Sequence, residues 1–560
     1  MNSPRYRCIL FLHHLRSIDR RNPCNHTSLA GRAMKPWIEE AKQAVEKCQA
    51  TQHFDVVADA MDAEKEAYTA EELAVLTRFF ISAGQMDLAS MLLQRLPIED
   101  WNEEHHQLAA QLGLSLDKLE VETLRPESLR IAMISVSDSG GAGTAAYRLH
   151  RGLRALGHDC RMYVAIKRRN DPTVRVLPPH PGGSEPIASW EKDEETIVWK
   201  QALQRFRQNL SSYPNRPQGL ETFTDARSTA RIDLIQEIRE ADVLNFHWIA
   251  GIIDYPTLAP LLGDIPSVWT MHDIHAFTGG CHYSVGCLNY RQRCGNCPAL
   301  GSNREDDFSR QSWLMKQEVY SRVRLQAVSP SKWLQNEALS STLFSQFPVH
   351  CIPNGFPLDV FKPGEREELR NRLGIGTEEK MILFGADSVS NLRKGFQLLI
   401  ESLPHLDASL PPDQRVALVT FGRKSPDLNL PSRFRMVSLG SIEEEEKIAG
   451  VYGAADLFVI PSLEDNLPNT VVESLACGTP VVGFSIGGIP DMVTHMQTGY
   501  LARPFDVVDL AAGINWVLTR PEAEEREIRP RCRNVAESGY GQELQAERYL
   551  ALFQQVISSR

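Results

Sequence analysis

The sequence predicts an α/β fold in which parallel sheets carry helices on both faces. From residue 129 onward, short apolar runs alternate with amphipathic stretches, which is the pattern of doubly wound sheets. Residues 129–136 and 457–460 are runs of the length and composition expected for buried strands of such a sheet. Glycine-containing turns and polar side chains follow several of these runs. Because open α/β sheets bind ligands at the carboxyl ends of their strands, these turns are the first places to search for a site.

The part of the chain that precedes the sheets has a different pattern. Three stretches within residues 36–118 place apolar residues at helical spacing, so we expect an all-helical appendage over residues 36–125. The two stretches beside Gly84 are loosely similar to one tetratricopeptide hairpin, but no period repeats across the segment. A small packing appendage and a partner-binding array are both open. Residues 1–35 are basic, and they are either a poorly ordered tail or an extension ahead of a start at Met34.

Composition excludes several classes of protein. The chain has 560 residues, a hydrophobic content of 42% and a formal net charge of −11 at pH 7. This length allows roughly two to four domains with sizeable cores. The acidic balance argues against a dedicated nucleic-acid binder, and no apolar run has the length that spans a bilayer. The 11 cysteines are mostly isolated, which is typical of reduced, cytoplasmic proteins.

Residues 456–499 have the strand, loop, helix, strand order of a nucleotide-binding half-sheet. We expect strands over residues 457–460 and 481–484, with a short helix between them that starts near Thr470 and is capped by Asn469. This order places loops and helix N-termini at the carboxyl edge of one sheet. Helix N-termini favour phosphate, so the segment is a candidate site for a phosphorylated ligand.

Two acids and a basic pair stand in this part of the chain. Asp465 lies in the loop, and Glu473 lies eight residues later in the helix, where carboxylates suit the hydroxyl groups of a sugar or ribose. Arg393, Lys394 and Gly395 precede another predicted helix. A cation at a helix N-terminus is unfavourable unless an anion sits there, which predicts a bound diphosphate. A solvated surface pair is the alternative.

A glycine loop follows the first strand of the sheet region. Gly140, Gly141 and Gly143 stand where the chain turns from strand to helix, and the helix is expected over residues 145–156. Such a loop presents backbone N–H groups to an anion, although it is also found as a plain tight turn.

Two histidines end neighbouring predicted strands. His272 and Asp273 follow the strand over residues 267–271, which is the favoured place for reactive groups. His247 and Trp248 end the preceding strand. They either line an acceptor site or pack in the core.

Residues 456–499 resemble the nucleotide-binding half of family 4 retaining glycosyltransferases, whose E-x7-E signature sits in a P-S-x-x-E…E-A-x-A-x-G-x-P-V-V frame. Glu473 matches the second acid, and Asp465 stands where the first is usually Glu. Lys394 matches the lysine of the family's K-G pair. The arginine that usually follows the preceding strand is missing, because residues 386–388 read Ala-Asp-Ser.

This resemblance covers residues 129–558 and implies two Rossmann-like domains that face each other across a cleft, the GT-B type. The first domain, which binds the acceptor, would span residues 126–352. The second, which binds the nucleotide sugar, would span residues 353–537. A last helix within residues 538–560 would cross back onto the first domain.

The resemblance also implies roles for individual residues. His272 would contact the donor sugar near the reaction centre, Asp273 would orient His272 or the acceptor, and Asp465 would hold the sugar. The implied donor-binding groups are the glycine loop, the basic pair, the loop after the strand and the ribose acid: Gly140, Gly141, Gly143, Arg393, Lys394, Asn466, Leu467 and Glu473. No Asp-x-Asp motif occurs, so a catalytic metal is not expected.

An insertion over residues 276–300 carries Cys281, Cys287, Cys294 and Cys297 in the spacing C-x5-C-x6-C-x2-C. Four thiolates satisfy tetrahedral zinc, so we expect a structural zinc site, with two disulfides or four reduced thiols as alternatives. The run from Met-His-Asp to Cys-Gly-Asn-Cys-Pro resembles the colanic-acid, or exopolysaccharide, branch of the family.

The expected function is transfer of a sugar from a nucleotide diphosphate sugar to a glycan or lipid-linked glycan acceptor, with retention at the anomeric carbon. Breaking the anomeric bond leaves a nucleoside diphosphate, so an enzyme must stabilise negative charge there. A lipid-linked acceptor would draw the cytoplasmic protein to the inner face of the membrane. One alternative is an inactive transferase-like subunit that binds a protein partner through its helical N-terminus. A sugar-nucleotide epimerase or a phosphorylase is another.

Overall fold

The computed structural model describes Leu108 and residues 128–178, 197–364, 366–389, 391–423 and 430–559. The chain divides into two units, Met1–Glu127 and Ser128–Arg560, and the described residues belong almost entirely to the second unit. The predicted basic tail and the predicted helical appendage lie outside the described residues. None of the helices that the structure describes is long and apolar enough to cross a membrane.

The first half of the second unit is built on a seven-stranded sheet with the order β3-β2-β1-β4-β5-β6-β7, and all neighbouring strands are parallel. The strands are β1 (Arg130–Ser137), β2 (Asp159–Ile166), β3 (Val174–Val176), β4 (Val243–Phe246), β5 (Ser267–Thr270), β6 (Gln326–Ser329) and β7 (Val349–Cys351). The helices are α8 (Gly140–Ala155), α9 (Ile197–Ser211), α10 (Gln236–Arg239), α11 (Tyr255–Asp264), α12 (Phe308–Tyr320) and α13 (Lys332–Ser340).

The second half contains a six-stranded parallel sheet with the order β10-β9-β8-β11-β12-β13. The strands are β8 (Lys380–Ser388), β9 (Val416–Arg423), β10 (Phe434–Ser438), β11 (Leu457–Ile460), β12 (Val481–Phe484) and β13 (Gly499–Ala502). The helices are α14 (Arg366–Arg372), α15 (Phe396–Ser409), α16 (Glu445–Ala454), α17 (Asn469–Ala476), α18 (Ile489–Met492), α19 (Val507–Leu518), α20 (Glu522–Gly539) and α21 (Gln542–Ser558). Two doubly wound parallel sheets confirm the predicted fold class.

Several predicted boundaries are wrong for local reasons. The helix predicted over residues 145–156 begins earlier, at Gly140, and takes in the glycine loop. Residues 232–241, whose sequence pattern is helical, form a 3₁₀ turn followed by the short α10, because Ile235 between them has an extended backbone with ψ of 116°. Asn469 is the first residue of α17, and Pro468 holds the cap position that was predicted for Asn469.

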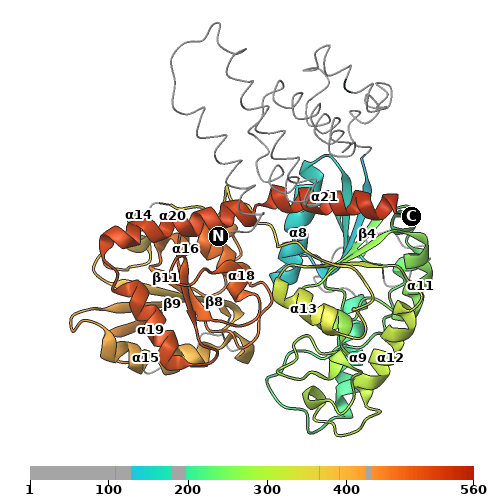
Figure 1. Ribbon diagram of the computed structural model, residues 1–560, viewed down its shortest axis with the longest axis horizontal. Helices are drawn as coiled ribbons and strands as arrows, with labels where there is room; N and C mark the ends of the chain where they lie inside the picture. Colours follow the sequence, from blue (N-terminus) through green and yellow to red (C-terminus); the bar gives the residue numbers. More distant parts are fainter. Residues whose placement is uncertain are drawn as a thin grey trace, which may run out of the picture. The chain divides into compact units, whose positions relative to one another are not determined.

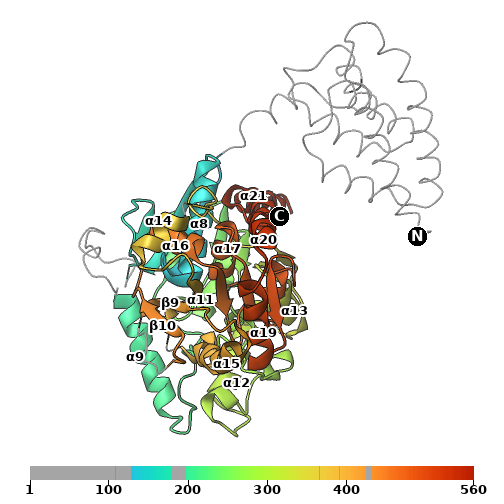
Figure 2. The ribbon, with the colours of Figure 1, turned by 90° about the vertical axis from the view of Figure 1, so that its left-hand side faces the viewer.

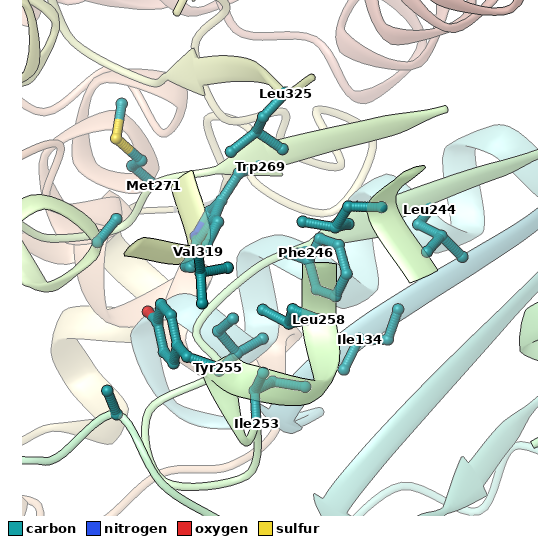
Figure 3. Close-up of a cluster of buried hydrophobic side chains, with 14 of the residues drawn as sticks. Ile134, Leu244, Phe246, Ile253, Tyr255, Leu258, Trp269, Met271, Val319 and Leu325 are labelled. Carbon is teal, nitrogen blue, oxygen red and sulfur yellow. The ribbon is translucent and has the colours of Figure 1, made fainter. Parts of the chain in front are cut away.

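Each sheet is covered on both faces by apolar side chains. In the first sheet, β4 and β5 are buried at every position, as expected for strands between two helical layers. One face packs a cluster that includes Phe246, Tyr255, Trp269 and Met271 (Figure 3). In the second sheet, α15 and α19 lie side by side on one face (Figures 1 and 2), while α16, α17 and α20 supply the apolar cluster of the other face.

The last helix, α21, runs from the second half onto the first and lies against α8 (Figure 1). Tyr549 and Phe553 of α21 are buried in the same cluster as Met133 of β1. The two helices approach closely, because a Cβ at Gly152 of α8 would lie 2.9 Å from the Cβ of Ala546. This packing ties the two halves together away from the loops at the strand ends.

Strand order explains where functional side chains gather. In the first sheet the order reverses between β1 and β4, and in the second it reverses between β8 and β11. Ligands of open α/β sheets bind beside such reversal points, at the carboxyl ends of the strands. The predicted glycine loop follows β1, the basic pair follows β8, and Asp465 follows β11. All of them therefore stand where the topology favours a site.

Candidate functional site

The predicted glycine loop forms the first turn of α8. Gly140 has a φ of +72°, a left-handed backbone that glycine adopts without strain. A Cβ at Gly143 would lie 2.5 Å from the carbonyl oxygen of Ser137, so a side chain does not fit there. At Gly141 the space is open, and its carbonyl oxygen accepts a 3.1 Å hydrogen bond from Asn469 Nδ2. The first turn of α8 therefore contacts the start of α17 in the other half of the site.

His272 stands at the carboxyl end of β5 and contacts the loop between β11 and α17, residues 461–468. The backbone oxygen of His272 accepts a 3.1 Å hydrogen bond from Asn466 Nδ2. Asn466 Oδ1 accepts a 2.5 Å hydrogen bond from the hydroxyl of Ser331, which caps α13. Burial lowers the pKa of His272 to about 4, so its ring is neutral at pH 7. Two residues predicted from separate motifs thus meet across the two halves.

Asp273 is held by three donors of its own half. Trp248 Nε1 and His282 Nδ1 each lie 2.7 Å from Asp273 Oδ2, and the backbone N–H of His275 donates to Oδ1 at 2.8 Å. Burial opposes ionisation, but His282 and the other donors outweigh it and lower the pKa of Asp273. The carboxylate therefore organises the start of the insertion. Trp248, for which an acceptor site and core packing were both open, is the indole partner of this carboxylate.

Lys394 and Asp465 form an ion pair between the ends of β8 and β11. Lys394 Nζ lies 2.6 Å from Asp465 Oδ2, and the hydroxyl of Ser462 donates to the same oxygen at 3.1 Å. Asp465 is only 4% exposed. Burial raises its pKa, but the charges of Lys394 and Arg393 prevail and lower it. The predicted donor lysine and the predicted sugar acid are thus direct partners.

Arg393 is surrounded by groups from both halves. Its Nε lies 2.9 Å from Glu221 Oε1, and its Nη1 donates to the backbone oxygen of Glu464 at 2.9 Å. The guanidinium carbon lies 3.9 Å from the ring centroid of Tyr283, and Nη1 lies 3.4 Å from Asp465 Oδ2. In this arrangement the guanidinium connects the strand ends of the two halves.

Glu473 is paired with an arginine that comes from the first half. Arg148 of α8 places Nη2 3.0 Å from Glu473 Oε1 and 2.8 Å from Glu445 Oε1. The hydroxyl of Tyr452 donates to Glu473 Oε2 at 3.2 Å. Burial raises the pKa of Glu473, and the charge of Arg148 opposes that rise. The predicted ribose acid is therefore tied to α8 by a buried bridge.

Sequence reasoning did not single out Arg148, although a signal was present. Arg148 is 4% exposed and lies on the buried face of α8 beside Leu149 and Ala145. A charged residue among the apolar positions of an amphipathic helix is unusual and points to a buried partner. Its guanidinium carbon also stacks on the rings of Phe356 and Phe361, at 4.7 Å and 5.2 Å.

Three further contact residues carried weaker signals. Glu221 lies in an irregular segment with no pattern around it. Tyr283 lies between two of the insertion's cysteines, and Glu464 directly precedes Asp465. Leu467, which was predicted to bind the sugar donor, has a side chain that is buried in the apolar cluster of the second half.

The insertion, residues 276–300, contacts the β11–α17 loop directly. The Glu464 carboxylate accepts hydrogen bonds from the backbone N–H groups of Ser284 and Val285, at 3.2 Å and 3.0 Å. Burial raises the pKa of Glu464, although these two N–H groups act against it. Ser284 also lines the cavity that contains the cysteines. The insertion thus holds the loop that carries Asp465.

Cys281, Cys287, Cys294 and Cys297 all line this one cavity, and all four are free thiols. The backbone N–H of Gly279 donates to Cys294 Sγ at 3.2 Å. Burial raises the pKa of Cys294 to about 12 and that of Cys297 to about 11. Within the described ranges, no three His, Cys, Asp or Glu side chains are grouped closely enough to hold a metal ion. The zinc site stays a prediction.

Comparison with known proteins follows the same division of the chain. Residues 379–520 match the sequence family described as Glycosyl transferases group 1. The D-inositol 3-phosphate glycosyltransferase of Mycolicibacterium smegmatis is 32% identical over 187 residues, which are 31% of this chain and 41% of that protein. The enzyme of the same description from Corynebacterium jeikeium is 27% identical over 288 residues, 48% of this chain and 62% of that protein. The chain thus spans 41% to 62% of the length of these curated relatives.

Solved structures resemble the whole of the two-sheet region. Sucrose-phosphate synthase from Thermosynechococcus elongatus superposes with a TM-score of 0.52 at 19% identity, covering 77% of this chain and 99% of that one. Anabaena HepE in complex with UDP and glucose superposes with a TM-score of 0.50 at 16% identity, covering 76% and 100%. These likenesses show the fold, two Rossmann-like domains of the GT-B type. The second of these domains carries the glycosyl transferase group 1 match.

Proposed function

We propose that this protein is a retaining glycosyltransferase that moves a sugar from a nucleotide diphosphate sugar to a glycan or lipid-linked glycan in exopolysaccharide biosynthesis. The observation that carries the proposal is the ion pair of the partly exposed Lys394 with the buried Asp465, 2.6 Å apart after the ends of β8 and β11. It lies at the strand reversal of the domain that matches the glycosyl transferase group 1 family. A cation at this position is suited to a diphosphate.

In this mechanism Lys394 stabilises the negative charge of the diphosphate. Cleavage of the anomeric bond raises the negative charge on the departing nucleoside diphosphate, and a fixed cation in a buried site stabilises that charge. Asp465 pairs with Lys394, and in this proposal it would turn to the hydroxyl groups of the donor sugar once diphosphate neutralises the lysine. Arg393 is already bound to Glu221 and Glu464, so we assign it to holding the loop in place.

Glu473 is the ribose-binding group in this proposal. Each of its oxygens accepts one hydrogen bond from the chain, from Arg148 and from Tyr452, and a carboxylate oxygen has capacity for a second. Two hydroxyl groups of a ribose fit that remaining capacity. Arg148 favours the ionised carboxylate, which is the better acceptor.

His272 and Asp273 have different tasks. His272 is half-buried, neutral and directly bonded to the β11–α17 loop, so it is placed to contact the donor sugar. Asp273 is held by Trp248, His282 and the N–H of His275, so we assign it to positioning the loop that carries His272 instead of contacting the acceptor.

A second part of the proposal is a structural zinc ion in the insertion, which would draw the four cysteines of the cavity closer together than they stand in the described structure. Four sulfur donors are the set that tetrahedral zinc takes, and N–H···S hydrogen bonds such as the one from Gly279 stabilise thiolates. Bound zinc would cross-link the insertion beside Ser284. Metal analysis of the purified protein is expected to find about one zinc per chain. That zinc should disappear on Cys294→Ser and persist on Cys351→Ser, which changes an exposed cysteine outside the cavity. A metal-free wild type would remove the zinc proposal.

In this proposal the protein acts in the cytoplasm, and a lipid-linked acceptor would bring it to the inner membrane face. The described cysteines are all free thiols, which is typical of a reducing compartment. Support for an acceptor of this kind comes from the insertion motif, and a protein partner at the N-terminal segment is the further interaction to be tested.

The test is turnover of a panel of UDP-, GDP-, ADP- and dTDP-sugars, measured as release of nucleoside diphosphate. We expect one donor to be turned over by the wild type, and Glu473→Gln to raise the donor KM about 10-fold or more. Glu527→Gln is the control, because Glu527 is 67% exposed and pairs only on the surface of α20. A wild type that binds a donor without turning it over, even with glycan acceptors added, would indicate the inactive-scaffold alternative. A wild type that neither binds nor turns over any donor overturns the proposal.

A further inference from the structure

A chain of buried hydrogen bonds lies behind His272. His272 Nε2 lies 3.0 Å from His247 Nδ1, and His247 Nε2 lies 2.8 Å from Asn245 Oδ1. Asn245 Nδ2 donates to the carbonyl oxygen of Val268 at 3.1 Å and to the hydroxyl oxygen of Thr270 at 3.0 Å. Asn245 and His247 are two residues apart on β4 and its extension, so their side chains share one face of the sheet.

The Val268 end of this series of hydrogen bonds determines which ring nitrogen of each histidine carries the proton. The carbonyl oxygen of Val268 can only accept, so the Asn245 atom that faces it is the amide nitrogen. Asn245 Oδ1 then faces His247, and it needs a donor, so the proton of His247 sits on Nε2. His247 Nδ1 is left with a lone pair.

The same reasoning determines the tautomer of His272. His247 Nδ1 has a lone pair, so His272 Nε2 must donate to it. The two ring planes differ by 27° with centroids 5.3 Å apart, which lets the N–H lie close to the plane of the accepting ring. His272 is then the Nε2–H tautomer, and its Nδ1 carries the free lone pair. Among the groups that the structure describes, none donates to His272 Nδ1.

We propose that His247 is a positioning residue that locks His272 in the Nε2–H tautomer, so that His272 Nδ1 accepts a hydrogen bond from a hydroxyl group of a bound sugar. The inference deepens the proposed function and rests on it for the identity of the ligand. It assigns His272 the part of an acceptor and excludes it as the proton donor to the departing phosphate.

The environment of the two rings agrees with neutral forms. His247 is 2% exposed, and burial lowers its pKa well below the usual value. Burial also lowers the pKa of His272, against the opposing charge of Asp273. A second proton on His247 would sit on Nδ1 and set two N–H groups against each other within the 3.0 Å contact.

The deciding experiment is nuclear magnetic resonance of the full chain labelled with ¹⁵N-histidine, read for the protonated ring nitrogen of each histidine at pH 7. We expect His247 and His272 both to be protonated at Nε2 only, with assignments made from His247→Gln and His272→Gln. A wild-type His272 protonated at Nδ1 overturns the proposal. This measurement needs no ligand, so it is independent of whether a nucleotide sugar binds.

Substitutions at His247 then test the link between the two rings. His247→Leu removes the acceptor, so His272 should become a mixture of tautomers, whereas the side-chain oxygen of His247→Gln should restore Nε2–H. In turnover, His247→Leu is expected to lower kcat about 10- to 100-fold with an unchanged Kd for the nucleoside diphosphate, and His247→Gln to recover most of kcat. A tautomer at His272 that is the same in wild type and His247→Leu would show that His247 does not position it. Should His247→Leu fail to fold, the wild-type spectrum and His247→Gln still decide the matter.

Discussion

The two halves of the site handle buried polar groups in opposite ways. In the first half, His272, His247 and Asn245 form a neutral chain of hydrogen bonds that ends on a backbone carbonyl. In the second half, Asp465 and Glu473 are held by the cations Lys394 and Arg148. The chain of side chains behind His272 thus offers fixed uncharged hydrogen-bonding groups, whereas the groups around Lys394 and Glu473 offer fixed charges, of which Arg148 comes from the first half.

This difference matches the chemistry of a nucleotide diphosphate sugar. Sugar hydroxyl groups are neutral and form directional hydrogen bonds, so they are best bound by groups whose donor and acceptor atoms are fixed before binding. The diphosphate carries the charge that grows during transfer, so it is best met by a cation in a buried site. The contrast also has an energetic consequence. Breaking a buried ion pair leaves an uncompensated charge, which costs more than losing one neutral hydrogen bond.

The largest effect is expected at Arg148, which reaches from the first half into the second. Arg148→Met keeps most of the side-chain volume but leaves Glu473 and Glu445 without their cation. Because breaking a buried pair typically costs about 3 to 5 kcal/mol, we expect a loss of that order in the free energy of unfolding. Urea denaturation measures it. Arg322→Met, which changes a 64%-exposed surface arginine, is the control and should cost less than about 1 kcal/mol. Equal midpoints for the two variants would contradict the charged character of this bridge.

A smaller loss is expected at Asp465. Asp465→Asn keeps a hydrogen-bond acceptor beside Lys394 but removes the charge, so we expect a cost of about 2 kcal/mol. Diphosphate would supply the missing negative charge, so the thermal stabilisation by a bound nucleoside diphosphate should be greater in Asp465→Asn than in the wild type. Thermal melts with and without the nucleotide measure the difference. Identical stabilisation of both proteins would show that Lys394 does not meet the diphosphate.

Breaking the contact between the insertion and the β11–α17 loop should lower the free energy of unfolding by still less. Glu464→Gln removes the negative charge that the N–H groups of Ser284 and Val285 both face and leaves one of them without an acceptor, so we expect the free energy of unfolding to fall by about 1 kcal/mol. The freed loop carries Asp465, so the donor KM should rise while kcat changes little. Steady-state kinetics separates the two parameters, and Glu318→Gln, at a 64%-exposed position on α12, is the control. A KM equal to that of the control would mean that the insertion does not position the loop.

The smallest effect is expected from the neutral rings of His272 and His247, whose contribution to the free energy of unfolding changes gradually with pH. Burial holds the pKa of His272 at about 4 and that of His247 well below 6.5, while both would titrate near 6.5 in the unfolded chain. Between pH 6.5 and 4 the unfolded state therefore binds more protons, so the free energy of unfolding falls as the pH is lowered through this window. The charge of Asp273 beside His272 works against burial, because it raises the pKa of His272, but burial prevails.

Urea midpoints at several pH values measure this slope. His247→Gln should flatten it, because one of the histidines whose pKa burial lowers is gone, and the substitution His405→Gln at an exposed position is the control. A slope that is the same in His247→Gln and in the wild type would place the titration elsewhere.

Much of the site could be predicted because it follows from strand ends. His272, Lys394, Asp465 and Asn466 each come directly after or soon after a recognisable strand, and parallel strands end at one edge of a sheet. Sheet order, which decides that β8 and β11 are neighbours, is then enough to bring Lys394 to Asp465. Gly140, Gly141 and Gly143 were expected in a loop before the helix, but they form the first turn of α8 itself.

The groups that connect the two halves could not be predicted in the same way. Glu221, Tyr283 and Arg148 reach their partners across the boundary between the sheets, and periodicity within one segment says nothing about what faces it. Arg148 had the clearest signal in the sequence, because it is a charged residue on the apolar face of a predicted helix. The break at Ile235 is a similar case, because tertiary packing decides the backbone of a single residue within an otherwise helical pattern.

The most direct test of the central claim is calorimetric binding of nucleoside diphosphates and their sugars to the full chain, with wild type and Lys394→Ala side by side. The site assignment predicts that the wild type binds at least one nucleotide diphosphate sugar, that Lys394→Ala weakens it by about 100-fold, and that Arg372→Ala, a 70%-exposed surface cation on α14, binds as the wild type does. An equal affinity in wild type and Lys394→Ala, or no binding of any nucleotide sugar by the wild type, would contradict it.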